Sequence, residues 1–347
     1  MTLKILFAGT PQAAVPAFEK LADDFDVVAV LTRPDAVRGR GRRPEPSPMK
    51  VAAQKRSIPV LDMKPSSPEF FDAVNTYKPD IAAVVAYGRI LRKNVLDAVP
   101  LGWLNLHFSL LPAWRGAAPV QRTIWAGDTT SGVSVFRLDE GMDTGKLIAR
   151  ESYLISGEPT SGELMSDLAD FGAKIYADAF HKVEKAWQAN GCKPGTLIDD
   201  LFTEQMTNDD PSRAIARKIT TDDAHADFSL TAPVLSAHLR ACDPDPGAWT
   251  VVHKQDGSST RLRLDKVATV APDDPALTSA CEQQNIRLAD CEPGSILVSK
   301  KHVWLVPTNP QTHGVVEIVR ITAPGKKPMR GADWARGARL SREDRCA

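Results

Sequence analysis

Cysteine is scarce in this chain of 347 residues, and its placement excludes several kinds of protein. There are five cysteines, none occurs before Cys192, and no two are spaced as C-x-x-C. A disulfide framework or a zinc knuckle needs paired cysteines, so we expect neither, and we expect no bound metal. A reduced compartment is the simplest interpretation, and we therefore expect a cytoplasmic protein.

Long hydrophobic runs and an overall charge are missing as well. The first apolar run, within Met1 to Phe7, is too short for a signal peptide or a membrane span, and we expect no association with a membrane. Lysine and arginine number 43, and aspartate and glutamate also number 43, so any nucleic acid would have to meet local basic clusters. The length favours two domains.

The common nucleotide and nucleophile motifs are absent too. Gly9-Thr10-Pro11 follows the first apolar run, but neither G-x-G-x-x-G nor a P-loop lysine is present, which favours a plain turn over a dinucleotide site. There is also no G-x-S-x-G elbow. In any group-transfer reaction, the attacking nucleophile would therefore have to come from a substrate.

Strand and helix signals alternate through the first half of the chain. Helix starts are predicted at Ser47-Pro48 and Ser67-Pro68, and a capping box at Thr160–Glu163 begins a helix that runs to about Ala189. Strands are predicted at 4–8, 26–32, 80–87, 102–107 and 131–138. Such alternation predicts an α/β domain over residues 1–189, with a doubly wound, mostly parallel, Rossmann-like sheet.

The second half of the chain has a different pattern of predicted elements. Glycine and proline break the long helix at 191–195, and residues 190–208 are predicted to be a linker. Helices are then expected at 211–218 and 233–242, and the Pro- and Asp-rich stretch 271–292 is expected to loop out. Short strands are predicted at 248–253, 260–267, 295–298, 302–306 and 315–321. This pattern predicts a smaller C-terminal β-barrel, OB-like, over residues 209–347.

One stretch in the first half carries a candidate for chemistry. Asn105 and His107 lie two residues apart on a predicted strand, so both side chains face the same way, just before a loop at the strand end. An amide and an imidazole there can hold a carbonyl oxygen and move a proton; the alternative is a histidine that only caps the strand. Asp143, between Gly141 and Gly145, either forms an ordinary turn or orients that imidazole.

Basic residues gather in two places. The stretch 33–56 has eight positive and two negative side chains. Four arginines of this stretch form what we call the arginine arm. The arm can become ordered by binding phosphates, or it can simply be solvated. A second basic region contains Lys326 and Lys327 and extends into an arginine-rich tail. The arm consists of Arg38, Arg40, Arg42 and Arg43.

These motifs resemble a known family. Asn105-x-His107-x-Ser109-Leu110-Leu111-Pro112, with the run 115–121 and Asp143 downstream, is similar to the 10-formyltetrahydrofolate-dependent formyltransferases. The arginine arm, the run 114–121 and the stretches 216–219, 247–249 and 325–329 resemble the branch that formylates methionyl-tRNA. The likeness covers nearly the whole chain and thins at 271–292 and after Gly337. Phe108 stands where that family has a smaller residue, and Phe228 where tryptophan is usual.

The resemblance implies a function and a set of roles. The first domain would transfer the formyl group of its co-substrate, 10-formyltetrahydrofolate, to the α-amino group of initiator methionyl-tRNA, with no metal or redox cofactor. The catalytic residues would be Asn105, His107 and Asp143, and the barrel domain would bind tRNA. The folate would lie on Ser109, Leu110, Leu111 and Pro112. The tRNA would contact Arg38, Arg40, Arg42, Arg43, Lys326 and Lys327, and we expect a monomer.

Three alternatives remain. A sugar-nucleotide formyltransferase shares the first domain but has no evident use for the arginine arm. A formyltetrahydrofolate hydrolase would release formate without an amine acceptor. A tRNA-binding module without catalytic activity would not need Asn105, His107 and Asp143 together.

Overall fold

The computed structural model describes residues 2–37 and 44–347. The chain divides into two compact units, each assembled from several segments. The first unit contains residues 1–119, 130–154 and 165–216, and the second contains 120–129, 155–164 and 217–347. Among the described residues, none of the helices has the length and apolar character needed to cross a membrane.

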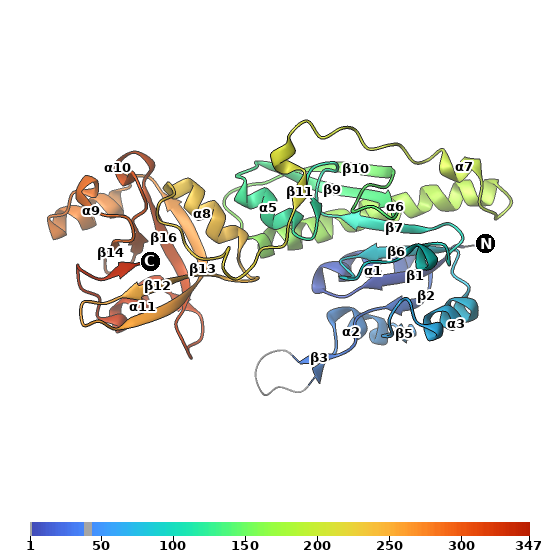
Figure 1. The fold of residues 1–347 in the computed structure, drawn as a ribbon, viewed down its shortest axis with the longest axis horizontal. Coiled ribbons are helices and arrows are strands. Elements are labelled where there is room, and N and C mark those ends of the chain that lie inside the picture. The colour runs from blue at the N-terminus through green and yellow to red at the C-terminus, as the bar shows by residue number, and fades with distance from the viewer. Residues whose placement is uncertain (1, 38–43) are drawn as a thin grey trace. The chain divides into compact units, whose positions relative to one another are not determined.

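A seven-stranded sheet formed by the described residues is the centre of the first unit (Figure 1). Neighbouring strands pair in parallel, except that the strand of residues 130–137, next to one edge, runs antiparallel to both of its neighbours. The order is β10 (Leu147–Leu154), β9 (Thr130–Arg137), β7 (Trp103–His107), β6 (Ile81–Val85), β1 (Lys4–Gly9), β2 (Asp26–Leu31) and β5 (Val60–Leu61). The prediction of a doubly wound, mostly parallel sheet is confirmed.

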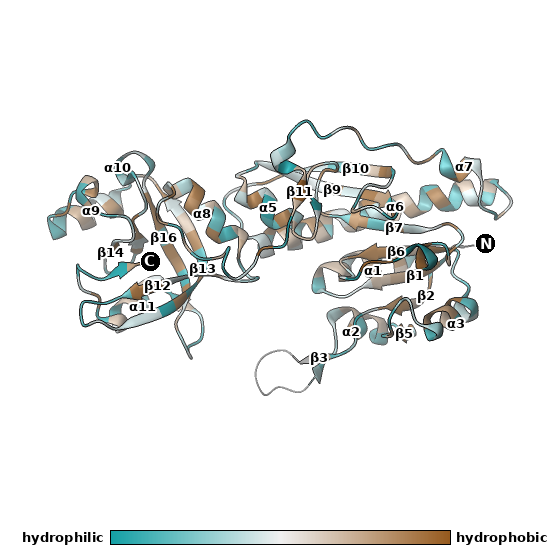
Figure 2. Cartoon of the chain, in the orientation of Figure 1, coloured by the Kyte–Doolittle hydropathy of each residue, from teal (hydrophilic) through white to brown (hydrophobic). Residues whose placement is uncertain are grey.

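Helices cover both faces of this sheet because successive residues of the central strands point to opposite sides. On one face, the ring of Phe7 in β1 lies 5.4 Å from that of Phe18 in α1 (Val15–Asp24). On the other face, Leu6 packs in a cluster with Phe70 of α3 (Pro68–Tyr77) and Val95 of α4 (Lys93–Leu96). Figure 2 shows the apolar character of these strands.

Helix starts follow their sequence signals closely. The Ser47 hydroxyl accepts the Lys50 N–H at 3.0 Å at the start of α2 (Pro48–Lys55). The predicted capping box is present at the start of α6 (Ser161–Ala189). There the Thr160 N–H donates to Glu163 Oε2 at 2.9 Å, and the Glu163 N–H donates to Thr160 Oγ1 at 3.2 Å.

The carboxyl ends of the parallel strands meet at one edge of the sheet. Gly9 of β1 pairs with Val85 of β6, and Val84 pairs with Asn105 of β7. The loops that follow these strands therefore begin side by side. In such sheets ligands bind outside this edge, and His107 is the last residue of β7.

The second unit contains the predicted antiparallel barrel. Its strand order is β14 (Ile296–Val298), β15 (Val303–Leu305), β16 (Val315–Thr322), β13 (Ser259–Val270), β12 (Ala248–His253) and β18 (Arg345–Cys346). A bridge between Ser295, just before β14, and Arg345 of β18 nearly closes the sheet on itself. All five cysteines lie within the described residues, and all are free thiols.

Several elements differ from the sequence prediction. Instead of a helix at 211–218, a short 3-10 turn precedes β11 (Ile215–Ala216), because that backbone pairs with β8 (Arg115–Gly116). The stretch 271–292 does not loop out: it contains α9 (Pro275–Gln284). Asp274 caps this helix, whose apolar side packs in a small core of its own. The edge strand β10 was not predicted, because its mostly exposed residues lack an apolar run.

Tyr176 of α6 provides a test of this packing. Its buried hydroxyl accepts the Val84 N–H at 2.8 Å and donates to Leu104 O at 2.6 Å, and burial holds the pKa of this phenol well above its usual range. Tyr176→Phe removes both of these buried hydrogen bonds, each worth about 0.5–1.5 kcal/mol, so the free energy of unfolding in urea should fall by about 1–3 kcal/mol. Tyr77→Phe is the matched control and should change it by less than about 0.5 kcal/mol. Equal stability of the two variants would contradict the assignment.

Candidate active site

His107 is fixed by a backbone carbonyl at the carboxyl edge of the sheet. Its Nε2 lies 3.0 Å from Trp114 O, and the side chain is buried. A carbonyl oxygen can only accept a hydrogen bond, so Nε2 must carry a proton. In the neutral ring, Nδ1 is then the nitrogen with a free lone pair, and this is the atom that can take up a proton.

Asp143 faces that second nitrogen. Its Oδ2 lies 3.7 Å from His107 Nδ1 and accepts the Gly116 N–H at 2.8 Å. The gap to the imidazole is longer than a hydrogen bond, yet short enough for the carboxylate to stabilise a protonated ring. Gly116 has φ of 121°, and a Cβ there would lie 2.9 Å from Ala216 O, so this position requires glycine.

Asn105 lies on the same face of β7 as His107, two residues earlier. Its side chain is half-buried, and its carboxamide has no hydrogen-bond partner within the described residues. The amide N–H groups are therefore available to a ligand. The structure brings Asn105 and His107 together on one strand, with Asp143 reaching them from the loop that follows β9.

The loop after β7 is held from within and from the neighbouring strand. Ser134 of β9 donates to Ser109 O at 2.7 Å and accepts the Leu111 N–H at 3.0 Å. The Ser109 hydroxyl itself donates to Ala113 O at 2.7 Å. Ser109, Leu111 and Pro112 are buried, and Leu110 is half-buried against Gly132. These side chains shape the loop.

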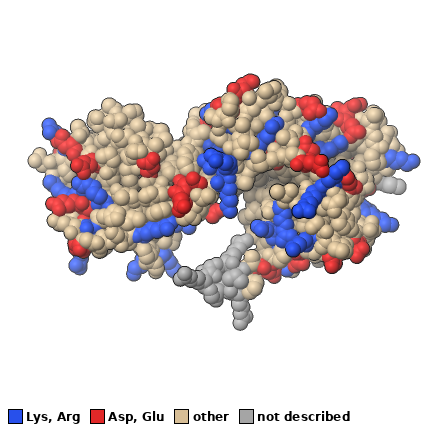
Figure 3. All heavy atoms as spheres, in the orientation of Figure 1, with Lys and Arg blue, Asp and Glu red and all other residues tan. Residues whose placement is uncertain are grey.

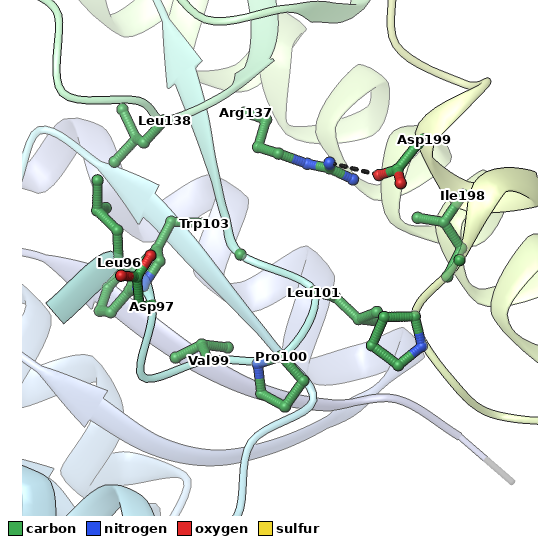
Figure 4. A pocket seen from close by; sticks show the side chains of 13 residues that line it. Leu96, Asp97, Val99, Pro100, Leu101, Trp103, Arg137, Leu138, Ile198 and Asp199 are labelled. Atoms are coloured by element: carbon green, nitrogen blue, oxygen red, sulfur yellow. Dashed lines mark hydrogen bonds and ion pairs between the residues drawn. The ribbon is translucent and has the colours of Figure 1, made fainter. Parts of the chain in front are cut away.

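Described residues of the first unit form at least two cavities. The larger, of about 370 Å³, lies at the amino end of β7 and contains neither Asn105, His107 nor Asp143 (Figure 4). Arg137 extends across it and pairs with Asp199 at 2.7 Å. The smaller, of about 290 Å³, is lined by Leu111, the start of β10, Thr203, Glu204 and Met206, and it therefore adjoins the loop after β7.

The basic residues singled out in the sequence fall in two regions. Lys326 and Lys327 are exposed in the turn between β16 and β17 (Met329–Arg330) of the second unit. Arg38, Arg40, Arg42 and Arg43 lie outside the described residues. On the drawn face of each unit, lysine and arginine side chains are mixed with carboxylates (Figure 3). No group of three or more His, Cys, Asp or Glu side chains that could hold a metal is found in residues 2–37 and 44–347.

Sequence reasoning gave no role to Trp114, Gly116 and Ser134, although each holds part of the site. Trp114 and Gly116 act through backbone atoms, which any residue type provides. Ser134 lies on a predicted strand, where a single small polar residue is unremarkable. Trp114 has φ of 61°, and this left-handed turn has no local signal when the residue is a tryptophan.

Comparisons with known proteins identify the family of the chain. The family model described as formyl transferase matches residues 3–180, and the one described as formyl transferase, C-terminal domain, matches 218–339. A methionyl-tRNA formyltransferase from Bifidobacterium longum (strain DJO10A) is 45% identical over 350 residues, which is 98% of each chain. Another, from Mycobacterium avium (strain 104), is 40% identical over 344 residues, again 98% of each chain.

A solved structure has the same fold. The N-formyltransferase from Helicobacter canadensis, in complex with folinic acid and dTDP-3-aminofucose, superimposes with a TM-score of 0.59. It covers 91% of this chain and 98% of its own, at 16% identity. At that identity the likeness concerns the fold alone.

Ser134 should be essential to the shape of the loop after β7. Ser134→Ala removes the acceptor for the buried Leu111 N–H, and the free energy of unfolding should fall by about 1–3 kcal/mol. Ser131→Ala on the same strand is the matched control, because the buried Ser131 hydroxyl has no partner within the described residues. In urea titrations, Ser131→Ala should lower the free energy of unfolding by less than about 0.5 kcal/mol. A Ser134 variant as stable as the control would show that the loop does not depend on this hydroxyl.

Proposed function

The chain belongs to the formyl transferase family, and we propose that it transfers the formyl group of 10-formyltetrahydrofolate to the α-amino group of initiator methionyl-tRNA, for translation initiation. The observation that carries the proposal is the full-length likeness, at 45% identity, to a methionyl-tRNA formyltransferase. The grouping of Asn105, His107 and Asp143 at one sheet edge supports the same chemistry.

The reaction joins an amine to a formyl carbon. The α-amino nitrogen attacks that carbon, a C–N bond forms, and the carbonyl electron pair moves onto oxygen. The bond from carbon to N10 of the folate then breaks, and N10 takes a proton in exchange for the one that the amine loses. A free α-amino group has a pKa of about 7.7–8.0, so a nearby base is needed to keep it neutral.

Each of the three residues has a role in this exchange. Asn105 donates its free amide N–H to the developing oxyanion, an effect worth about 10²–10³ in rate. His107 Nδ1 accepts the amine proton and passes it on. Asp143 stabilises the imidazolium while the proton is held. Such acid–base assistance contributes about 10²–10⁴ in rate.

The folate would bind along Ser109, Leu110, Leu111 and Pro112. Because the Ser109 hydroxyl is occupied by Ala113 O, backbone groups and apolar surface would provide the contacts. For the tRNA, the arginine arm and the exposed Lys326 and Lys327 would neutralise phosphates.

A formylation assay tests this function directly. Purified protein and formyl donor are mixed with charged initiator methionyl-tRNA, elongator methionyl-tRNA or an amino-sugar nucleotide. We expect formyl transfer to the initiator tRNA. Transfer to the nucleotide sugar would instead support a sugar-nucleotide formyltransferase. Formate release without any amine acceptor would support a hydrolase.

Removing the proton-handling residues should stop the chemistry. His107→Ala and Asp143→Ala should each lower the single-turnover rate by about 10²–10⁴, while tRNA binding survives. His181→Ala is the control, since this half-exposed histidine pairs with Asp24 at 3.2 Å and packs against the ring of Phe25, neither of which belongs to the candidate site. Near-normal single-turnover chemistry in either His107→Ala or Asp143→Ala would contradict the assignment.

The basic turn should contribute to tRNA affinity through charge alone. Lys326→Gln combined with Lys327→Gln should flatten the dependence of log K on log salt by about 0.7–0.9 for each phosphate that the variant no longer neutralises. The pair Lys20→Gln and Lys93→Gln removes two charges from helices of the first unit and serves as the control. Binding titrations at several salt concentrations measure this slope, and equal slopes for the two double variants would exclude the turn from the tRNA interface.

A further inference from the structure

Gln205 lies in the stretch that joins α7 (Thr196–Asp199) to β11, far along the chain from the candidate active site. Its carboxamide nitrogen donates to Asp143 O at 2.8 Å and to Gly145 O at 2.9 Å. Both N–H groups of this amide are therefore used on the backbone of the loop that carries the Asp143 carboxylate. Gln205 is half-buried, so these bonds are partly shielded from water.

Arg115 fixes which way this amide points. The Gln205 Oε1 accepts from Arg115 Nη2 at 2.6 Å and from Arg115 Nε at 3.2 Å. A guanidinium has donors only, so the amide oxygen must face Arg115 and the NH₂ group must face the loop. Glutamate at this position would satisfy Arg115 but would turn an acceptor toward two carbonyl oxygens.

Arg115 also lies between the two residues that hold the site. Trp114 O binds His107 Nε2, and the Gly116 N–H binds the Asp143 carboxylate. This segment pairs in turn with β11, where Ile215 lies opposite Arg115. Gln205 therefore connects the Asp143 loop to the same short strand that orients the imidazole.

The Asp143 loop needs such a connection. Within the loop, Asp139 Oδ1 accepts the Gly141 N–H and the Thr144 hydroxyl, which shapes the turn without anchoring it. Met142 next to Asp143 is 53% exposed. The carboxylate is 3.7 Å from the imidazole, too far for a direct bond to set its place.

We propose that Gln205 and Arg115 are positioning residues for formyl transfer: together they hold the Asp143 carboxylate at its working distance from His107. The inference rests on the proposed function and adds a positioning role for Gln205, which lies in the predicted linker. It predicts that the catalytic rate, and not the affinity for tRNA, depends on the two donors of the Gln205 amide.

Two substitutions separate the contacts. Gln205→Met keeps the length of the side chain and removes every hydrogen bond, whereas Gln205→Glu keeps the acceptor for Arg115 and removes both donors. Each should lower the single-turnover rate on the order of 10-fold to 10²-fold, the effect of a small misplacement of a reacting group, with KM for tRNA unchanged. Glu204→Gln is the control: this neighbouring side chain is exposed, pairs with Lys146 at 2.9 Å, and should leave the rate as it is.

A double variant tests whether Gln205 acts through Asp143. In an Asp143→Asn background, Gln205→Met should cause little further decrease in rate, because the carboxylate that it positions is already gone. An additive decrease would overturn the proposal, and so would a wild-type rate in Gln205→Met. Thermal unfolding of each variant identifies any that fail to fold, and Gln205→Glu, which keeps the Arg115 contact, then decides the question.

Hydrogen exchange gives a readout that does not depend on activity. The Gly116 amide donates to the Asp143 carboxylate, so its exchange should become faster in Gln205→Met and match that in Asp143→Ala. Unchanged exchange of Gly116 would overturn the positioning role even if the wild-type protein proved to use another acceptor. Failure of the wild-type protein to formylate methionyl-tRNA would count against the proposed function alone.

Discussion

The hydrogen bond from His107 Nε2 to the carbonyl of Trp114 is the interaction on which the candidate active site depends. It decides which ring nitrogen holds the proton, and it turns the other nitrogen toward Asp143. That carbonyl faces the ring only because the chain turns back after β7 and Trp114 adopts a left-handed conformation. The chemistry of a side chain is thus set by backbone geometry seven residues away.

That geometry is held by contacts from distant parts of the first unit. Ser134 binds the loop from β9, and Ile215 of β11 pairs with Arg115. The bond between Gly116 and Asp143 spans 27 residues of sequence, and the bonds between Arg115 and Gln205 span 90. The stretch from α7 to β11 therefore contributes contacts both to the segment 114–116 and to the loop that carries Asp143.

Features with a local physical signal could be predicted from the sequence. Apolar runs located the parallel strands, serine and threonine caps located the starts of α2 and α6, and alternation placed Asn105 and His107 on one face. Elements whose hydrogen bonds come from elsewhere could not be predicted. β11 exists because β8 lies beside it. The helix α9 is a different case, because Asp274 and Pro275 are a local start signal, but the proline- and aspartate-rich composition of 271–292 was interpreted as a loop. The roles of Trp114 and Gln205 could not be predicted from the sequence either, because their partners lie far along the chain or are backbone atoms.

The residues that would carry out the reaction differ from those that would select the acceptor. Under the proposed function, Asn105, His107 and Asp143 would handle an oxyanion and a proton, which any amine attacking a formyl group would produce, so this trio would be compatible with many acceptors. A tRNA differs from other amines by its row of phosphates, and only positive charges outside the trio can respond to them. Under the proposed function, the arginine arm together with Lys326 and Lys327 would therefore favour a tRNA as the source of the amine. The spacing of His107 and Asp143, 3.7 Å between Nδ1 and Oδ2, would affect how fast that amine reacts.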